Sequence, residues 1–134
     1  MAYFGKTYVE EKSENYEALV RSLKIPDELV DMVVKSKTKQ KIEKNGDEYV
    51  FTLQFNDRAK VLHFKSGVEF EESVGPKGIS KTTFTVDGNK ITQVQKFQDG
   101  IVVTSVGEYY PDKLDVTMTT TSWPGTVKRY FVAE

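Results

Sequence analysis

The chain has no cysteine and only one histidine, His63. Disulfide bonds, thiolate zinc sites and cysteine nucleophiles are therefore excluded, and so are metal sites built from several histidines. Alanine and leucine are also scarce: together they supply 10 of the 134 residues, whereas valine, isoleucine, threonine and the aromatic residues supply 51. Because β-branched and aromatic side chains favour strands, this balance disfavours a helical bundle and predicts a mostly-β domain.

Neither sign of charge dominates, and no long apolar run is present. The 19 basic and 20 acidic side chains leave a formal net charge of -1, without the basic excess of nucleic-acid-binding proteins, so we expect no nucleic acid partner. No segment approaches the roughly 20 apolar residues of a membrane span, and the N-terminus has no basic start followed by an apolar run. We therefore expect a single cytoplasmic domain over residues 1–134.

One stretch near the N-terminus has helical periodicity. Ser13 or Asn15 can cap a first helix, and Pro26 suits the first turn of a second. The pattern predicts a helical hairpin, which serves either as a simple cap on a core or as a lid. The apolar positions at helical spacing are Tyr16, Leu19, Val20 and Leu23 in the first helix and Leu29, Met32 and Val33 in the second.

From Lys35 onward the hydrophobic period changes to two. Lysines alternate with other residues from Lys35 to Lys41, so one face of this strand is basic and faces water. Turn signals such as Asn45-Gly46-Asp47 then separate further alternating segments. About ten short strands follow one another at a spacing of roughly 8–12 residues, which predicts an all-β, up-and-down antiparallel sheet, closed as a barrel or packed as a sandwich.

Strand parity indicates which side chains face the interior. The alternation turns Thr38, Gln40 and Ile42 inward on one strand and Leu114, Val116 and Met118 inward on the penultimate strand. The last strand is ambiguous, because one parity contains Lys128 and the other Arg129. Either choice places a cation inside, where it must be paired. A salt-bridged structural network and a cavity for an anionic ligand both explain such a cation.

Several sequence blocks lie in register along the whole chain without large gaps. The most specific is Phe64-Lys65-Ser66-Gly67-Val68-Glu69-Phe70-Glu71-Glu72, and the others are residues 5–8 with 13–16, 43–47 and 85–90. Together they resemble intracellular fatty-acid-binding proteins, and Gly5-Lys6-x-Tyr8 with Trp123-x-Gly125 is most similar to insect midgut members. The resemblance implies a ten-stranded β-clam with a helix-turn-helix lid. It also implies one long-chain fatty acid, or a similar lipid, in an internal cavity.

The resemblance further implies a headgroup site: an Arg-x-Tyr pair on the last strand, another arginine two strands earlier and, in insect members, a glutamine on the second strand. Gln40 and Tyr130 match the glutamine and the tyrosine of this pattern. With Tyr130 as that tyrosine, Lys128 takes the place of the last-strand arginine and is expected to face inward. The length of chain after Tyr130 agrees with this register. The other arginine falls on Gly107. Lysine offers a point charge where arginine offers a planar fork. We therefore expect weaker carboxylate binding, with a retinoid or another neutral or carbonyl-bearing lipid as the alternative ligand.

The remaining expectations concern the ligand tail and its access route. The tail is expected to contact apolar residues of both helices and the sheet: Tyr16, Leu19, Val20, Leu23, Met32, Val33, Phe51, Val116 and Met118. The portal implied by the resemblance lies between the helical hairpin and two turns that contain Asn56, Asp57, Gly75 and Gly78. Basic residues near this rim are offset by acidic residues on the helices, so transient membrane contact is only a hypothesis. We expect a monomer without a cofactor.

Three other classes of protein fit the sequence less well. An enzyme would need a catalytic arrangement, but His63 stands alone in a strand and no nucleophile, phosphate-loop or paired-carboxylate motif is present. A pure interaction module would fill its interior with apolar side chains, against the inward Thr38 and Gln40. A secreted lipocalin would be expected to have a leader and cysteines. The sequence therefore favours a binding protein that is not an enzyme.

Overall fold

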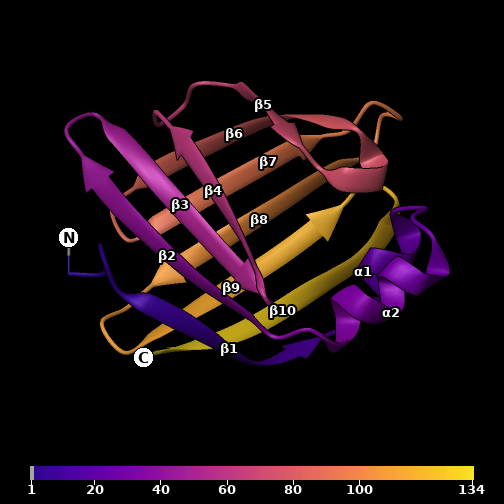
Figure 1. Ribbon diagram of the computed structural model, residues 1–134, viewed down its shortest axis with the longest axis horizontal. Helices are drawn as coiled ribbons and strands as arrows, with labels where there is room; N and C mark the ends of the chain where they lie inside the picture. The colour runs from indigo at the N-terminus through magenta and orange to yellow at the C-terminus, as the bar shows by residue number, and fades with distance from the viewer. Residues whose placement is uncertain (1) are drawn as a thin grey trace.

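The structure, a computed structural model, describes residues 2–134 and contains ten strands, two α-helices and one turn of 3-10 helix. In chain order (Figure 1) these are β1 (Thr7–Glu14), α1 (Tyr16–Ser22), α2 (Asp27–Lys35), β2 (Thr38–Asn45), β3 (Glu48–Phe55), β4 (Arg58–Phe64), β5 (Phe70–Ser73), the 3-10 turn Gly75–Lys77, β6 (Ile79–Asp87), β7 (Lys90–Lys96), β8 (Val102–Tyr109), β9 (Lys113–Thr120) and β10 (Trp123–Ala133). No helix within residues 2–134 is both long and apolar enough to cross a membrane.

All ten strands belong to one antiparallel sheet with the order β4-β3-β2-β1-β10-β9-β8-β7-β6-β5. The sheet curls into a nearly closed barrel, with β2–β4 crossing in front of β6–β9 in Figure 1. It begins at β4 and ends at β5, and no backbone ladder joins these two strands within the described part of the chain. The predicted all-β, ten-stranded architecture with a helical lid is confirmed.

The helical hairpin covers one end of the barrel (Figure 1). Leu19 and Val20 of α1 pack with Val30 of α2 and Val127 of β10 in a buried cluster. Val30 is 1% exposed and Met32 40% exposed, so the buried side of α2 is centred on Val30 rather than on the predicted stripe of Leu29, Met32 and Val33. The stripe is displaced because α2 packs on α1 through Val30 and turns its other apolar side toward the barrel interior.

The helix starts also differ in detail from the prediction. Asn15 occupies the cap position of α1 with a φ of 65° and makes no side-chain cap bond. Its amide instead donates to the carbonyl oxygen of Thr126 at 3.1 Å, which ties the hairpin to β10. Pro26 directly precedes α2, and its carbonyl oxygen accepts the N–H groups of Leu29 and Val30.

Aromatic side chains close the opposite end of the barrel. Tyr3 stacks on Tyr109 with ring centroids 4.8 Å apart, and Phe64 stacks on Phe84 at 4.5 Å. These rings belong to a continuous buried cluster, so the interior is filled at this end and hollow toward the helices.

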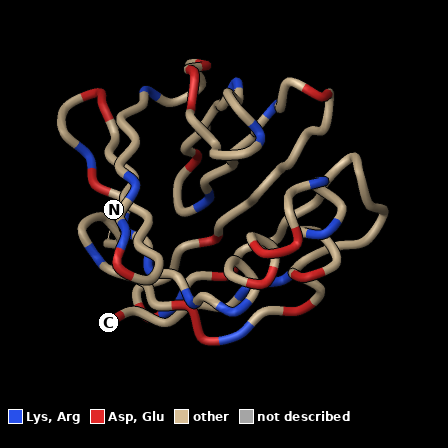
Figure 2. Tube along the Cα trace, turned by 45° about the vertical axis from the view of Figure 1, so that its right-hand side comes forward, with Lys and Arg blue, Asp and Glu red and all other residues tan. Residues whose placement is uncertain are grey.

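Positive and negative positions are interspersed along the helices and the hairpin turns (Figure 2).

Candidate functional site

Two adjoining cavities occupy the interior of the barrel. The outer cavity, about 640 Å³, lies between the helical hairpin and the sheet, and the inner cavity, about 220 Å³, lies deeper between the strands. Leu53, Lys60, Gln95 and Met118 line both, so the two spaces adjoin. The outer cavity is within the range of a typical small-molecule pocket, roughly 300–1,000 Å³, and the inner cavity extends it by a smaller space.

The apolar residues predicted to contact a ligand tail divide between these cavities. The outer cavity is lined by Tyr16, Leu19, Val20, Leu23, Met32, Val33 and Met118. The inner cavity is lined by Phe51 and Val116, together with Met118. The structure therefore brings all nine side chains to the predicted hollow.

The predicted portal residues occupy different positions at the outer rim. Gly75 lines the outer cavity. Asn56 and Asp57 form the exposed β3–β4 turn, and Oδ1 of Asn56 accepts a hydrogen bond from Ser36 at the end of α2 at 3.3 Å. Gly78 has a φ of 81°, and a Cβ there would collide with Oε1 of Gln98. Position 78 therefore favours glycine for its backbone conformation, whereas the exposed Gln98 side chain can move aside.

The predicted parity of the last strand is wrong. Arg129 is 9% exposed and faces inward, whereas Lys128 is exposed and donates to Oγ1 of Thr117 at 3.0 Å on the outer surface. Tyr130 also lies on the outer side, with Nζ of Lys12 5.2 Å from its ring centroid. The physical reason is register: Arg129 pairs with Val116, and directly opposite residues on neighbouring strands share a face of the sheet.

With this parity, the Arg-x-Tyr motif implied by the resemblance reads Arg129-Tyr130-Phe131. Phe131, 1% exposed, takes the inward position of the tyrosine. Lys128 and Tyr130 therefore lie away from the cavity, and Gln40 is the one predicted headgroup residue that lines it. The cation that faces the inner cavity from β10 is an arginine.

Arg129 is held by a carboxylate of the protein itself. Its Nε lies 3.0 Å from Oε2 of Glu10, and its Nη2 lies 2.9 Å from Oε1 of the same side chain. This is the two-bond, fork-like arrangement that arginine forms with carboxylates. Glu10 is 6% exposed and also accepts the backbone N–H and the hydroxyl of Thr38. The three side chains of Glu10, Thr38 and Arg129 thus connect β1, β2 and β10.

Aromatic rings complete the surroundings of Arg129. The guanidinium carbon lies 4.4 Å from the ring centroid of Tyr16 and 5.4 Å from that of Phe131. Burial by itself lowers the pKa of Arg129, but the interactions with Tyr16 and Glu10 outweigh burial and leave the pKa above its ordinary value. The guanidinium is therefore charged at neutral pH.

Gln40 is paired with a second inward side chain, Tyr109. The Tyr109 hydroxyl donates to Oε1 of Gln40 at 2.9 Å, and burial raises the pKa of Tyr109, so the hydroxyl keeps its proton. Gly107 lies beside this ring: a Cβ there would be 3.1 Å from Cε1 of Tyr109 and 3.3 Å from Cδ1 of Leu114. The Tyr109 ring thus crowds the backbone at position 107.

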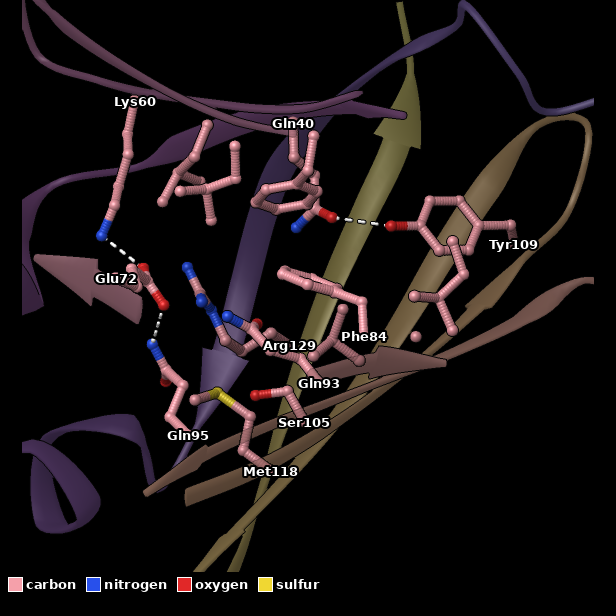
Figure 3. Close-up of a pocket in the computed structure, with 16 residues that line it drawn as sticks. Gln40, Lys60, Glu72, Phe84, Gln93, Gln95, Ser105, Tyr109, Met118 and Arg129 are labelled. Carbon is pink, nitrogen blue, oxygen red and sulfur yellow. Dashed lines mark hydrogen bonds and ion pairs between the residues drawn. The ribbon is translucent and has the colours of Figure 1, made fainter. Parts of the chain in front are cut away.

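A second buried carboxylate, Glu72, lies where the sheet does not close. Glu72 is 4% exposed, and its Oε1 accepts from the Thr82 hydroxyl at 2.7 Å and from Nε2 of Gln95 at 3.2 Å. Nζ of Lys60 donates to Oε2 of Glu72 and to the carbonyl oxygen of Ser73 at 2.8 Å. Lys60 is on β4 and Glu72 on β5, so this network links the two edge strands (Figure 3).

The single histidine is away from both cavities. His63 is exposed, and its Nδ1 lies 3.0 Å from Oε1 of Glu48 on the outer surface. Within residues 2–134 no group of three histidine, aspartate or glutamate side chains could hold a metal ion. The chemistry that lines the cavities is therefore hydrogen bonding, ion pairing and apolar contact.

These features define a class of protein: a ten-stranded β-clam with a helical lid over a cavity that is apolar near the lid and polar further in. No family model matches the chain. It is similar to fatty acid-binding protein 2 of Manduca sexta, with 39% identity over 99% of this chain and 100% of the relative, and to fatty acid-binding protein 1 of the same organism, with 37% identity over the same shares. A solved structure of the fatty-acid-binding protein isolated from Manduca sexta has 41% identity, covers 98% of this chain and 99% of its own, and gives a TM-score of 0.91. The chain belongs to the fatty-acid-binding protein family.

Proposed function

We propose that this chain binds one long-chain fatty acid, or a similar lipid, non-covalently in its internal cavities and carries it through the cytoplasm. The observation that carries the proposal is the outer cavity of about 640 Å³, lined by apolar side chains of the helices and the sheet. The names of the Manduca sexta relatives support the choice of ligand. Binding and release, without turnover, are the whole of the proposed activity.

The tail supplies most of the binding free energy in this proposal. Burial of 16–18 carbons at about 0.8 kcal/mol per CH₂ amounts to about 13–14 kcal/mol before costs. Ordering of the ligand and incomplete desolvation reduce that amount substantially. The polar groups of the inner cavity then determine the orientation and class of the ligand rather than the bulk of its affinity.

The proposed carrier acts as a monomeric single domain, and its lid opens at the rim formed by α2, the β3–β4 turn and the Gly75–Lys77 turn. The contact from Ser36 to Asn56 connects two of these segments. Because both signs of charge occur along the helices (Figure 2), any contact with a membrane surface is proposed to be transient.

Native mass spectrometry of protein purified from its source tests the proposal. We expect one co-purifying lipid per chain, and we expect the delipidated protein to take up a fluorescent fatty acid or Nile red with the same stoichiometry. A protein that is isolated free of lipid and that refuses both probes would contradict the carrier function. Release of a chemically altered lipid would contradict the absence of turnover.

A neutral or carbonyl-bearing lipid is the second candidate ligand. The observation that favours it is the pairing of Arg129 with Glu10, which leaves the inner cavity without an uncompensated arginine charge. A retinoid is one member of this group. Identification of the native ligand by its mass separates the two candidates.

A further inference from the structure

Two cationic side chains line the inner cavity, the buried Arg129 and the half-buried Lys60, and each already has a carboxylate partner. Arg129 has Glu10, which approaches it with two oxygen atoms, and Lys60 has Glu72. The two carboxylates are 6% and 4% exposed. The charges of these four side chains cancel, so the inner cavity offers no net positive charge to a ligand.

A fatty carboxylate would enter this cavity at a cost. Removal of a carboxylate from water is compensated only when a cation with good geometry receives it. Glu10, which does not itself line the inner cavity, accepts hydrogen bonds from Nε and Nη2 of Arg129, and Nη2 also donates to Oγ1 of Thr38 at 3.1 Å. An incoming carboxylate therefore finds only Nη1 as a remaining donor nitrogen, on a guanidinium whose charge Glu10 already balances, so its own charge stays uncompensated unless Glu10 is displaced.

An uncharged polar headgroup meets no such obstacle. Gln93 of β7 and Ser105 of β8 are directly opposite each other and line the inner cavity, and Gln40 lines its other side. Figure 3 shows Gln93 and Ser105 near Arg129. Amide and hydroxyl groups donate and accept hydrogen bonds, which suits a lipid alcohol, ester or amide.

We propose that Glu10 is a resident carboxylate that occupies Arg129 in place of a ligand, so that the cavity selects long-chain lipids with an uncharged polar headgroup over fatty carboxylates. This inference rests on the proposed function, because it assumes that a lipid enters the barrel. It narrows the ligand class and assigns the selectivity to one side chain. Glu10 acts through Arg129 and is a positioning residue.

The test compares two ligands of equal chain length, hexadecanoate and hexadecan-1-ol, by displacement of the neutral dye Nile red from delipidated protein at pH 8. The wild-type chain is expected to bind the alcohol at least as tightly as the carboxylate. Glu10→Gln keeps the size and the acceptor oxygen of the side chain but frees the charge of Arg129. A charge-assisted hydrogen bond is worth about 1.5–3 kcal/mol, so hexadecanoate should bind about tenfold or more tightly to this variant while the alcohol changes little.

Glu11→Gln is the matched control, because Glu11 is the next residue on β1, is exposed and loses the same charge. It should leave both affinities unchanged. Two results would overturn the inference: wild-type preference for hexadecanoate by about tenfold or more, or a folded Glu10→Gln variant with no gain for hexadecanoate. If that variant does not fold, the wild-type preference alone decides. Failure of the wild type to bind Nile red or either lipid would overturn the carrier function itself, which is a distinguishable outcome.

Discussion

Glu10 and Glu72 are both buried carboxylates paired with a cation, yet they lie in different parts of the sheet. Glu10 is on β1, which is joined by backbone ladders to β2 and β10, and its partner Arg129 is 9% exposed. Glu72 is on the edge strand β5, and its partner Lys60, on β4, has a side chain that is 34% exposed. The first pair is inside a continuous sheet, and the second spans its open seam.

The difference suggests two separate tasks for buried charge. The Glu10–Arg129 pair adds little connection to strands that are already hydrogen-bonded, but Glu10 balances the charge that Arg129 brings to the inner cavity. The Lys60–Glu72 pair connects two strands that no backbone ladder joins, and its lysine retains contact with water. We expect the first pair to be sensitive to the loss of one partner and the second to tolerate it.

The largest expected effect comes from Arg129→Leu. This change leaves Glu10 buried with only the N–H and hydroxyl of Thr38 as donors. Loss of one partner of a buried ion pair costs about 3–5 kcal/mol, so we expect the free energy of unfolding to fall by that amount in urea denaturation. Substitution of both partners by leucine should recover most of the loss, because no charge is then left unpaired.

Lys128→Leu is the control for this measurement and also tests the orientation of β10. Lys128 is the neighbouring residue, carries the same charge and is exposed. We expect a change within about 0.5 kcal/mol, as for most surface substitutions. Equal losses for the two variants would contradict the inward orientation of Arg129.

A smaller effect is expected from Lys60→Met. Methionine keeps most of the apolar stem, and Glu72 retains the donors of Thr82 and Gln95. Because the lysine is a third exposed, solvent screening limits the loss to about 1 kcal/mol. Amide hydrogen exchange in β5 should accelerate, since the link across the seam is weakened.

Lys81→Met is the matched control for the seam. Lys81 is exposed on β6, directly opposite Glu71 of β5, and it is away from the opening between β4 and β5. It should leave the exchange in β5 unchanged. A loss for Lys60→Met as large as that for Arg129→Leu would remove the distinction between the two pairs.

The sequence predicted the strand faces wherever one parity was apolar. On β9, Leu114, Val116 and Met118 alternate with polar residues, so their inward orientation followed from the period of two. On β10 both parities contain apolar residues and one cation, so alternation could not decide between them. The register with β9 decides, and register depends on pairing between strands.

The sequence did not predict the partner of Arg129, for a related reason. Glu10 begins a polar run that ends at Glu14, and an irregularity between Glu10 and Lys12 interrupts the pairing with β10. The two charges are 119 positions apart in the chain. Parity within β1 places Glu10 on the same face as Tyr8, which is fully buried, and this was the available signal. Only the folded sheet shows that this face meets Arg129.

The smallest expected effect concerns a third charged pair, Lys77–Asp99, at the outer rim. Nζ of Lys77 donates to Oδ2 of Asp99 and to the carbonyl oxygen of Leu23 at 2.6 Å. Hydrogen bonds from Lys77 and from the N–H of Ile101 hold the pKa of Asp99 below its ordinary value of 3.8. A lowered carboxyl pKa contributes stability above the ordinary pKa, and that contribution is lost as the pH falls through the lowered value.

Lys77→Met should therefore raise the pKa of Asp99 in an NMR titration of its carboxyl group. Lys24→Met, which removes the smallest of the contributing charges, should raise it less. If Asp99 titrates identically in the wild type and in Lys77→Met, the Lys77–Asp99 pair has no influence at the rim, and only the pairs of Glu10 and Glu72 distinguish the two regions.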